Sequence, residues 1–145
     1  MEILFVCTGN TCRSPMAETI FNSICPAGMV AFSRGTSVRN SLEASGNAVA
    51  AMGKMGLSLD NFIPGQWKKE DIDKAHMVLC MTGDHKNSIL REYPYAKEKL
   101  YTIYEFAQGA DKDVNDPYNG SLNDYEECAL ELNRLIISVL RKIVR

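Results

Sequence analysis

The residues best suited to chemistry stand near the start of the chain, in the stretch FVCTGNTCRSPMAE. Cys7 ends a short apolar run, a polar loop follows, and Arg13 and Ser14 come directly before a predicted helix. A loop that leads into a helix N-terminus points backbone N–H groups inward, and the positive end of the helix dipole adds to them. Such a place binds anions, and phosphate is a common occupant. Gly9 lets the backbone bend close to the ligand, and the planar guanidinium of Arg13 can hold two phosphate oxygens.

The same surroundings favour chemistry at the sulfur of Cys7. A free thiol is mostly protonated at neutral pH, and only the thiolate is a good nucleophile. A helix N-terminus, an arginine and a hydroxyl donor such as Ser14 all favour the thiolate. Taken singly, a strand-terminal cysteine, a loop arginine and a Ser-Pro helix start are ordinary structural features. Together, at this spacing, Cys7, Arg13 and Ser14 indicate a site of phosphate transfer.

Phosphate transfer to a thiolate also requires an acid that protonates the leaving group and later activates water. The loop DVNDPYNGS, residues 113–121, contains Asp116, followed by Pro117, which stiffens the turn. Next comes Tyr118, whose ring can form a wall of the pocket. An Asp-Pro pair alone indicates only a turn. Because the cysteine loop needs such an acid, we interpret Asp116 as that group.

Strands and helices are predicted to alternate along the chain. Apolar runs predict strands over residues 2–7, 29–36, 77–81 and 100–106. Helices are predicted from Pro15, behind Ser14 as N-cap, and over residues 41–56, 69–74 and 83–93. A final core-facing helix carries the apolar stripe Leu132, Leu135, Ile136, Val139, Leu140 and Ile143.

This alternation predicts a single α/β domain, residues 1–145, with a doubly wound parallel sheet covered by helices on both faces in three layers. Ligands of such sheets bind beyond the carboxyl ends of the strands. The segment 7–14 is predicted to lie at such an end, where the first strand turns into the first helix.

Composition and charge exclude several classes of protein. The chain has 145 residues and a net charge of -2, whereas a broad nucleic-acid surface requires a basic face. No window is apolar enough for a membrane span and no basic start indicates a signal peptide, so a cytoplasmic location is expected. The nucleotide-binding loop G-x-x-x-x-G-K-[ST] is absent from the sequence.

The cysteines indicate neither a disulfide framework nor a metal site. Five of them form an odd, scattered set, which suits a reducing compartment. With only two histidines and no C-x-x-C pair, no metal is expected. Cys25, Cys80 and Cys128 are interpreted as small buried side chains.

The motif VCTGNTCRSPMAE and the distant DPY together resemble the low-molecular-weight protein-tyrosine phosphatases, and the order of elements is similar along the whole chain. The resemblance implies a four-stranded parallel sheet, no metal or other cofactor, and hydrolysis of phosphorylated proteins through a phosphocysteine. Carried over by position, Cys7 is the nucleophile, Arg13 the phosphate clamp and Asp116 the general acid and base. The residues implied in binding substrate or phosphate are Thr8, Gly9, Asn10, Thr11, Cys12, Ser14 and Tyr118.

Two loop positions refine the resemblance. Cys12 is similar to the family's second loop cysteine, which can form a reversible disulfide with the nucleophile, and a tightly curled loop can bring the two within reach. Thr11 resembles the bacterial branch that acts on phosphoarginine, whereas tyrosine-directed members carry an apolar residue there. A hydroxyl can accept from a donor-rich guanidinium; alternatively, Thr11 only replaces a β-branched residue of similar shape. Phosphoarginine is thus the favoured substrate and phosphotyrosine the alternative.

Other features leave the surroundings of the site open. Arg34 stands where the family more often has alanine, and its side chain could approach the pocket or face water. The segment DNFIPGQW, residues 60–67, is also unusual, so the far wall of the pocket is undefined. His85 and Lys86 resemble a pair in the arginine-directed branch, without an assigned chemistry. The oligomeric state is left open as well.

Three other functions fit the residues less well. A thioredoxin-linked arsenate reductase needs two further cysteines, and Asn87 lies where the partner of Cys80 would fall. A cysteine phosphocarrier needs neither Arg13 nor Asp116. A catalytically dead phosphate-binding module is unsupported, because every reacting group is present.

Overall fold

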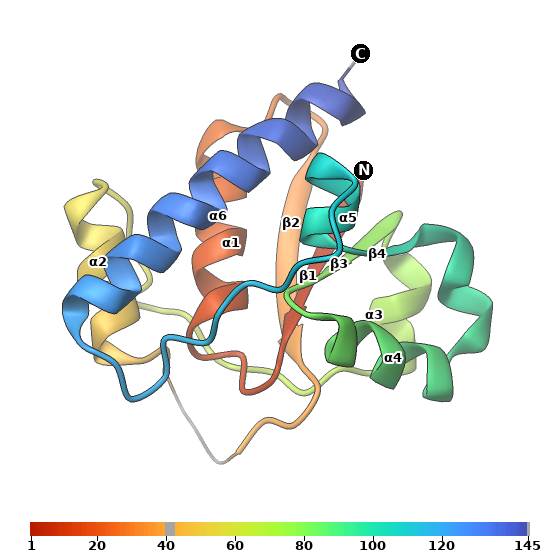
Figure 1. Ribbon diagram of the computed structural model, residues 1–145, viewed down its shortest axis with the longest axis horizontal. Helices are drawn as coiled ribbons and strands as arrows, with labels where there is room; N and C mark the ends of the chain where they lie inside the picture. Colours follow the sequence, from red (N-terminus) through yellow and green to blue (C-terminus); the bar gives the residue numbers. More distant parts are fainter. Residues whose placement is uncertain (40–42, 145) are drawn as a thin grey trace.

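The computed structural model describes residues 1–39 and 43–144, and a four-stranded parallel sheet forms its centre (Figure 1). The strands are β1 (Glu2–Cys7), β2 (Val30–Gly35), β3 (Met77–Cys80) and β4 (Leu100–Thr102), in the order β2-β1-β3-β4. Each pair of neighbouring strands is parallel. The predicted four-stranded parallel sheet is confirmed.

Helices cover both faces of the sheet. They are α1 (Arg13–Ile24), α2 (Gly46–Lys54), α3 (Lys69–Lys74), α4 (Gly83–Glu92), α5 (Ile103–Gln108) and α6 (Leu122–Ile143), with a 3₁₀ helix, η1 (Pro94–Lys99), before β4. Buried side chains of α1, α2, α5 and α6 share one core with Ile3 and Phe5 of β1. Those of α3, α4 and η1 share a second core with Leu4 and Val6. The predicted three-layer arrangement is confirmed (Figure 1).

The position of β1 inside the sheet explains its composition. It pairs with β2 on one side and β3 on the other, and Ile3, Leu4, Phe5 and Val6 are fully buried. Successive side chains of a strand point to opposite faces, so a strand covered on both faces needs an apolar residue at every position. The run therefore continues without a polar residue up to Cys7, at the carboxyl end of the strand.

The fourth strand is shorter than predicted. Leu100–Thr102 is strand and Ile103–Gln108 is α5, so the predicted strand over residues 100–106 is wrong beyond Thr102. The reason is a capping box. The Thr102 hydroxyl accepts from the Glu105 N–H, and the Glu105 carboxylate accepts from the Thr102 N–H. These two bonds start a helix where aromatic residues alone favour a strand.

The first helix begins earlier than predicted. α1 starts at Arg13 rather than Pro15, and its N-cap is Cys12, which makes no side-chain capping bond. Ser14, the predicted N-cap, lies inside the helix. Its hydroxyl lies against the sulfur of Cys7 instead of a backbone N–H, which is why it does not cap the helix.

The second predicted helix, over residues 41–56, is shorter in the structure. α2 begins at Gly46 and ends at Lys54. Ser45 is its N-cap, and the hydroxyl of Ser45 accepts a hydrogen bond from the Ala48 N–H. Positions 41 and 42 of the prediction lie outside the described residues.

α6 confirms the predicted terminal helix, and its apolar stripe faces the core. It starts well before the stripe, because Ser121 and Asp124 form a capping box at its N-terminus. In the part of the chain that the structure describes, no helix has both the length and the apolar character that crossing a membrane requires.

The three cysteines interpreted as buried differ in their surroundings. Cys80 and Cys128 are buried, as predicted. Cys25 is only partly buried, so that prediction is wrong for it. It lies just beyond the last residue of α1, where the chain turns, and its thiol donates to the Met29 carbonyl.

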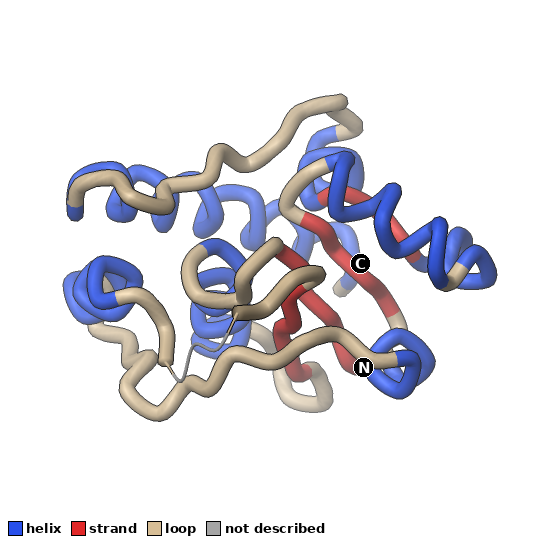
Figure 2. Tube along the Cα trace, turned by 90° about the horizontal axis from the view of Figure 1, so that it is seen from below, coloured by secondary structure: helices blue, strands red, loops and turns tan. Residues whose placement is uncertain are grey.

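The carboxyl ends of β1 and β2 lie side by side, because Cys7 is the register partner of Gly35. Beyond them, the Thr36 N–H donates to the Cys7 carbonyl and the Ser37 N–H to the Thr8 carbonyl, each at 2.9 Å. Seen from this end, loops lie in front of the strands (Figure 2). A Cβ at Gly35 would lie 2.5 Å from the Thr8 carbonyl oxygen, so this close approach requires glycine.

We expect Gly35→Ala to lower both stability and activity. The added methyl group would displace the Thr8 carbonyl, and overpacking of this kind costs about 1–3 kcal/mol in the free energy of unfolding. Gly53→Ala is the matched control, because an added Cβ in α2 would meet no atom of the described residues within 4 Å; a gain of about 0.5–1 kcal/mol is expected there. Urea denaturation measures the change in the free energy of unfolding of each variant. Equal stability of the two variants would contradict the close approach at Gly35.

Candidate active site

The β1–α1 loop, residues 7–14, is held in shape by Asn10. The backbone of Asn10 has a φ of 56°, in the left-handed region that asparagine tolerates better than most residues. Its side chain is buried, and Oδ1 accepts from the Gly65 N–H at 2.8 Å. Nδ2 donates to Ser14 Oγ at 2.9 Å and to Ser33 Oγ at 3.0 Å. One amide thus ties the loop to α1, to β2 and to the chain around Gly65.

These hydrogen bonds decide the direction of the proton on Ser14. The Gly65 N–H fixes the position of the Asn10 oxygen, so the amide nitrogen faces Ser14 and donates to it. With its oxygen accepting from Asn10, the Ser14 hydroxyl directs its own proton to Cys7 Sγ, 2.8 Å away. The Ser14 hydroxyl is therefore placed to donate a hydrogen bond to the nucleophilic sulfur.

The network continues to a carboxyl group that was not predicted. Ser33 Oγ donates to Glu18 Oε1 at 2.9 Å, and Glu18 lies on α1 one turn beyond Ser14. Burial raises the pKa of Glu18 above its usual value, and the hydrogen bond from Ser33 opposes this rise. Because Ser33 gives its proton to Glu18, its oxygen is left to accept from Asn10. Glu18 therefore supports the loop from behind.

Arg13 is the first residue of α1, and its guanidinium is buried beside the loop. Nη1 donates to the Val114 carbonyl at 3.0 Å, and Nη2 lies 3.5 Å from Asp116 Oδ2. Nε of Arg13 is buried and has no hydrogen-bond partner among the described residues. A buried donor without a partner is costly in a folded protein. This N–H is therefore suited to an anion bound in the loop.

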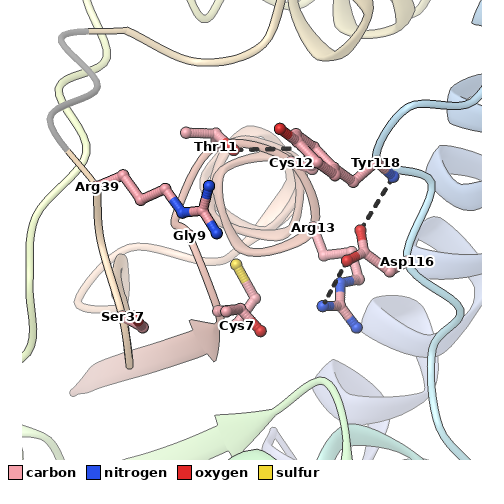
Figure 3. A pocket seen from close by; sticks show the side chains of 10 residues that line it. Cys7, Gly9, Thr11, Cys12, Arg13, Ser37, Arg39, Asp116 and Tyr118 are labelled. Atoms are coloured by element: carbon pink, nitrogen blue, oxygen red, sulfur yellow. Dashed lines mark hydrogen bonds and ion pairs between the residues drawn. The ribbon is translucent and has the colours of Figure 1, made fainter.

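A pocket of about 210 Å³ opens over the loop (Figure 3). Figure 3 shows Cys7 between Arg39 on one side and Asp116 on the other. The residues that line the pocket are Cys7, Thr8, Gly9, Thr11, Cys12, Arg13, Ser37, Arg39, Asp116 and Tyr118. Within residues 1–39 and 43–144, no group of three or more His, Cys, Asp or Glu side chains is placed to hold a metal ion.

The structure brings the predicted site residues together in two sets. The set that lines the pocket is Cys7, Thr8, Gly9, Thr11, Cys12, Arg13, Asp116 and Tyr118. Asn10 and Ser14 form the other set and are buried behind the loop. The predicted site residues therefore divide into those that line the pocket and those that hold the loop, a division that the sequence does not make.

Asp116 enters the pocket from the chain before α6. Its Oδ1 accepts from the Tyr118 N–H at 3.0 Å, which holds the Asp-Pro-Tyr turn, and its Oδ2 faces Arg13 (Figure 3). The side chain is 50% exposed, so water reaches the carboxyl group. A group that first donates a proton and later activates water needs this access.

Cys12 makes contacts that hold it to α6. Its Sγ lies 3.3 Å from the Tyr125 hydroxyl and 3.8 Å from Ser45 Oγ. Burial raises the pKa of Tyr125 to about 12, so its hydroxyl keeps its proton and can donate to the sulfur. Cys7 and Cys12 are both free thiols in the structure. The reversible disulfide between them stays a prediction.

Besides Glu18, three residues of the site were not predicted. Ser37 and Arg39 line the pocket from the segment after β2. His85, in the first turn of α4, is buried, with Nε2 2.8 Å from Thr8 Oγ1. The rule that ligands bind at the carboxyl ends of parallel strands points to Ser37 and Arg39. For His85 the sequence shows only its pairing with Lys86, and nothing in that pairing indicates a contact with Thr8.

Arg34 and the segment 60–67 lie behind the loop and not in the pocket. Arg34 Nε donates to Asp71 Oδ2 at 3.1 Å, and its guanidinium lies over the ring of Phe32. Gly65 lies against the Arg34 side chain and donates its N–H to the loop. Among the described lining residues none comes from 60–67, so this segment supports the loop and does not form a pocket wall.

Comparison with known proteins gives a consistent result. The family model for low molecular weight phosphotyrosine protein phosphatases matches residues 2–145. A protein-arginine-phosphatase of Geobacillus stearothermophilus is 39% identical over 142 residues, which cover 98% of this chain and 95% of that protein. The low molecular weight protein-tyrosine-phosphatase PtpB of Staphylococcus epidermidis is 32% identical over 136 residues, 94% of each chain.

A solved structure of a YwlE arginine phosphatase mutant with a phosphorylated active-site serine has the same fold. It superposes with a TM-score of 0.93 at 34% identity, over 99% of this chain and 95% of that chain. A phosphorylated side chain in the active site is what a reaction with a covalent phosphoenzyme produces.

The chain belongs to the low-molecular-weight phosphotyrosine protein phosphatase family. The resemblance inferred from the cysteine loop and the DPY motif is confirmed. The protein is a cysteine-based protein phosphatase that works through a phosphoenzyme intermediate.

We expect Ser14→Ala to lower kcat/KM about tenfold or more, because it removes the hydroxyl that donates to Cys7 Sγ. A hydrogen bond to a charged group contributes about 1.5–3 kcal/mol. Ser23→Ala is the matched control: Ser23 lies near the other end of α1, where its hydroxyl donates to the Ile20 carbonyl. Steady-state hydrolysis of an aryl phosphate measures both. An unchanged kcat/KM in folded Ser14→Ala would show that the Ser14 proton is not directed at the sulfur.

Proposed function

We propose that this protein hydrolyses phosphoarginine side chains of proteins, with a phosphocysteine at Cys7 as the intermediate. The proposal is carried by the convergence in one pocket of the Cys7 sulfur, the Arg13 guanidinium and the Asp116 carboxyl group. A nucleophile, a planar cation for the phosphoryl oxygens and a proton donor are the groups that this reaction requires. Similarity to the protein-arginine-phosphatase of Geobacillus stearothermophilus supports the class of substrate.

In the first step the Cys7 thiolate attacks phosphorus. The S–P bond forms as the P–N bond of phosphoarginine breaks, and the departing guanidine nitrogen takes a proton from Asp116. The Nε and Nη2 edge of Arg13 holds the phosphoryl oxygens and balances the charge that develops on them. Since Nη2 also faces Asp116, the same guanidinium keeps the acid close to the leaving group.

In the second step Asp116, now ionised, takes a proton from a water molecule. The water oxygen attacks phosphorus, the S–P bond breaks, and inorganic phosphate leaves. The electron pair of that bond returns to Cys7 as a thiolate, which the hydroxyl of Ser14 stabilises by donating to it. The exposed half of the Asp116 side chain gives the attacking water its access.

Thr11 is the pocket residue that supports phosphoarginine over phosphotyrosine. Among the described residues its hydroxyl has one long contact, 3.6 Å to Cys12 Sγ, so the oxygen can accept a hydrogen bond from a substrate. A phosphorylated guanidinium offers several N–H donors to such an oxygen, whereas a phenyl ring offers none. An alkyl side chain at this position would leave those donors without a partner.

Phosphotyrosine is the second candidate substrate, and two residues favour it. Tyr118 is 61% exposed at the pocket, where its ring can stack on a phenol. Arg39 brings a second guanidinium to the pocket, and like charges disfavour a cationic leaving group. PtpB, a relative named as a tyrosine phosphatase, is similar over nearly the whole chain.

We expect the wild type to have a higher kcat/KM for phosphoarginine peptides than for phosphotyrosine peptides. Thr11→Ile should reduce this preference about tenfold, because the loss of one hydrogen bond to a charged group corresponds to a factor of about ten. Thr19→Ile is the matched control, because the Thr19 hydroxyl bonds the Pro15 carbonyl within α1, outside the pocket. A preference for phosphotyrosine that Thr11→Ile does not change would favour the second candidate and leave Thr11 a packing residue.

We expect Cys7→Ser to abolish turnover while keeping affinity for inorganic phosphate. The serine hydroxyl is a much weaker nucleophile, whereas Arg13 and the backbone N–H groups of the loop remain in place. Cys25→Ser, just beyond α1 and outside the pocket, is the control and should retain wild-type activity. Phosphate release measures the turnover and isothermal titration the affinity. Sustained hydrolysis by Cys7→Ser would overturn the phosphocysteine route.

A further inference from the structure

A chain of three polar side chains leads from α4 to the pocket and has no part in the mechanism above. Thr82, the N-cap of α4, places Oγ1 3.0 Å from His85 Nδ1. On the other side of the ring, His85 Nε2 lies 2.8 Å from Thr8 Oγ1. His85 is buried, whereas Thr8 lines the pocket next to Cys7. The chain therefore joins the interior of the protein to the place where the phosphoryl group is expected.

The imidazole of His85 is neutral in this setting. Burial, and after it the charge of Arg13, lower the pKa of His85 to about 4. A neutral imidazole has one N–H and one acceptor nitrogen. His85 therefore donates to one threonine and accepts from the other, and this choice decides where the proton of Thr8 points.

The cap of α4 favours one of the two arrangements. Thr82 Oγ1 already accepts from the His85 backbone N–H, at 3.2 Å, so its own proton is available for His85 Nδ1. His85 Nε2 then carries the ring proton and donates to Thr8 Oγ1. The hydroxyl proton of Thr8 is then free to donate to a ligand in the pocket. In the opposite arrangement, the Thr82 proton would lose this acceptor and Thr8 would turn only oxygen lone pairs towards an anion.

We propose that Thr8 donates a hydrogen bond to the bound phosphoryl group and that His85 is the positioning residue that directs its proton. Sites of this kind hold the anion with backbone N–H groups and an arginine; Thr8 adds a side-chain donor to them. The inference rests on the proposed phosphatase site. It applies to every phosphorylated substrate, because it concerns the phosphoryl oxygens and not the leaving group.

The tautomer of His85 is measurable on the wild-type protein. The chain has only two histidines, so nitrogen NMR of the imidazoles gives a simple spectrum, which His76→Gln assigns. We expect a neutral His85 ring at neutral pH with its proton on Nε2, with and without inorganic phosphate. A proton on Nδ1 would overturn the proposal. This measurement needs no change at Thr8 or His85, so it stands even where a variant fails to fold.

Inorganic phosphate, used as a competitive inhibitor of aryl phosphate hydrolysis, tests the donor at Thr8. We expect Thr8→Val to raise the inhibition constant about tenfold and to lower kcat/KM by a similar factor. Thr8→Ser keeps the hydroxyl and should restore most of both. Ser88→Ala, on α4 and outside the pocket, is the control and should keep wild-type constants. Wild-type constants in folded Thr8→Val would overturn the proposal.

A double-mutant cycle tests the role of His85 separately. If His85 acts through Thr8, Thr8→Val has its full effect in the wild type and little effect in His85→Leu. His85→Gln, whose amide can still donate to Thr8, should retain more activity than His85→Leu. Independent, additive effects would overturn the positioning role. If the wild type does not prefer phosphoarginine, the proposed substrate is wrong. The inhibition constants for inorganic phosphate still test Thr8 in that case, because inorganic phosphate has no leaving group.

Discussion

The buried amide of Asn10 makes three hydrogen bonds at the centre of the β1–α1 loop, and the geometry around Cys7 depends on them. They hold a residue in the left-handed region and bind the loop to neighbouring segments on two sides. They also order the protons, because an amide anchored by the Gly65 N–H can only donate to Ser14, which then donates to the sulfur. Rotating any side chain of this network away from its partner would leave a buried polar group without a hydrogen bond. The loss in the free energy of unfolding would be about 1–3 kcal/mol.

Arg13 connects this loop to the chain that carries Asp116. One nitrogen of its guanidinium donates to the Val114 carbonyl and another faces the Asp116 carboxyl group, while Nε has no partner among the residues that the structure describes. The guanidinium that lines the pocket therefore also positions the carboxyl group of Asp116. A lysine could not do both, because a single ammonium group lacks the planar set of donors that point in different directions.

Apolar patterns predicted the elements that burial defines. The unbroken apolar run of β1 follows from burial on both faces, and the stripe of α6 from contact along one face. Prediction failed at residues 100–106, where a capping box between Thr102 and Glu105 outweighs the strand preference of aromatic residues. It failed at Ser14 as well, because a hydroxyl that looks like a helix cap is used for the sulfur of Cys7.

The sequence by itself determined the spacing of Cys7 and Arg13, the strand-to-helix turn between them and the Asp-Pro-Tyr turn that carries Asp116. Each of these depends on neighbours along the chain. Only the tertiary structure decided that His85 meets Thr8, 77 residues away, and that Arg13 meets the Val114 carbonyl, 101 residues away. It also placed Arg39 at the pocket and Arg34 behind the loop. A sequence states which donors and acceptors a chain has, but the parallel sheet, by gathering the carboxyl ends of its strands, sets the distances between them.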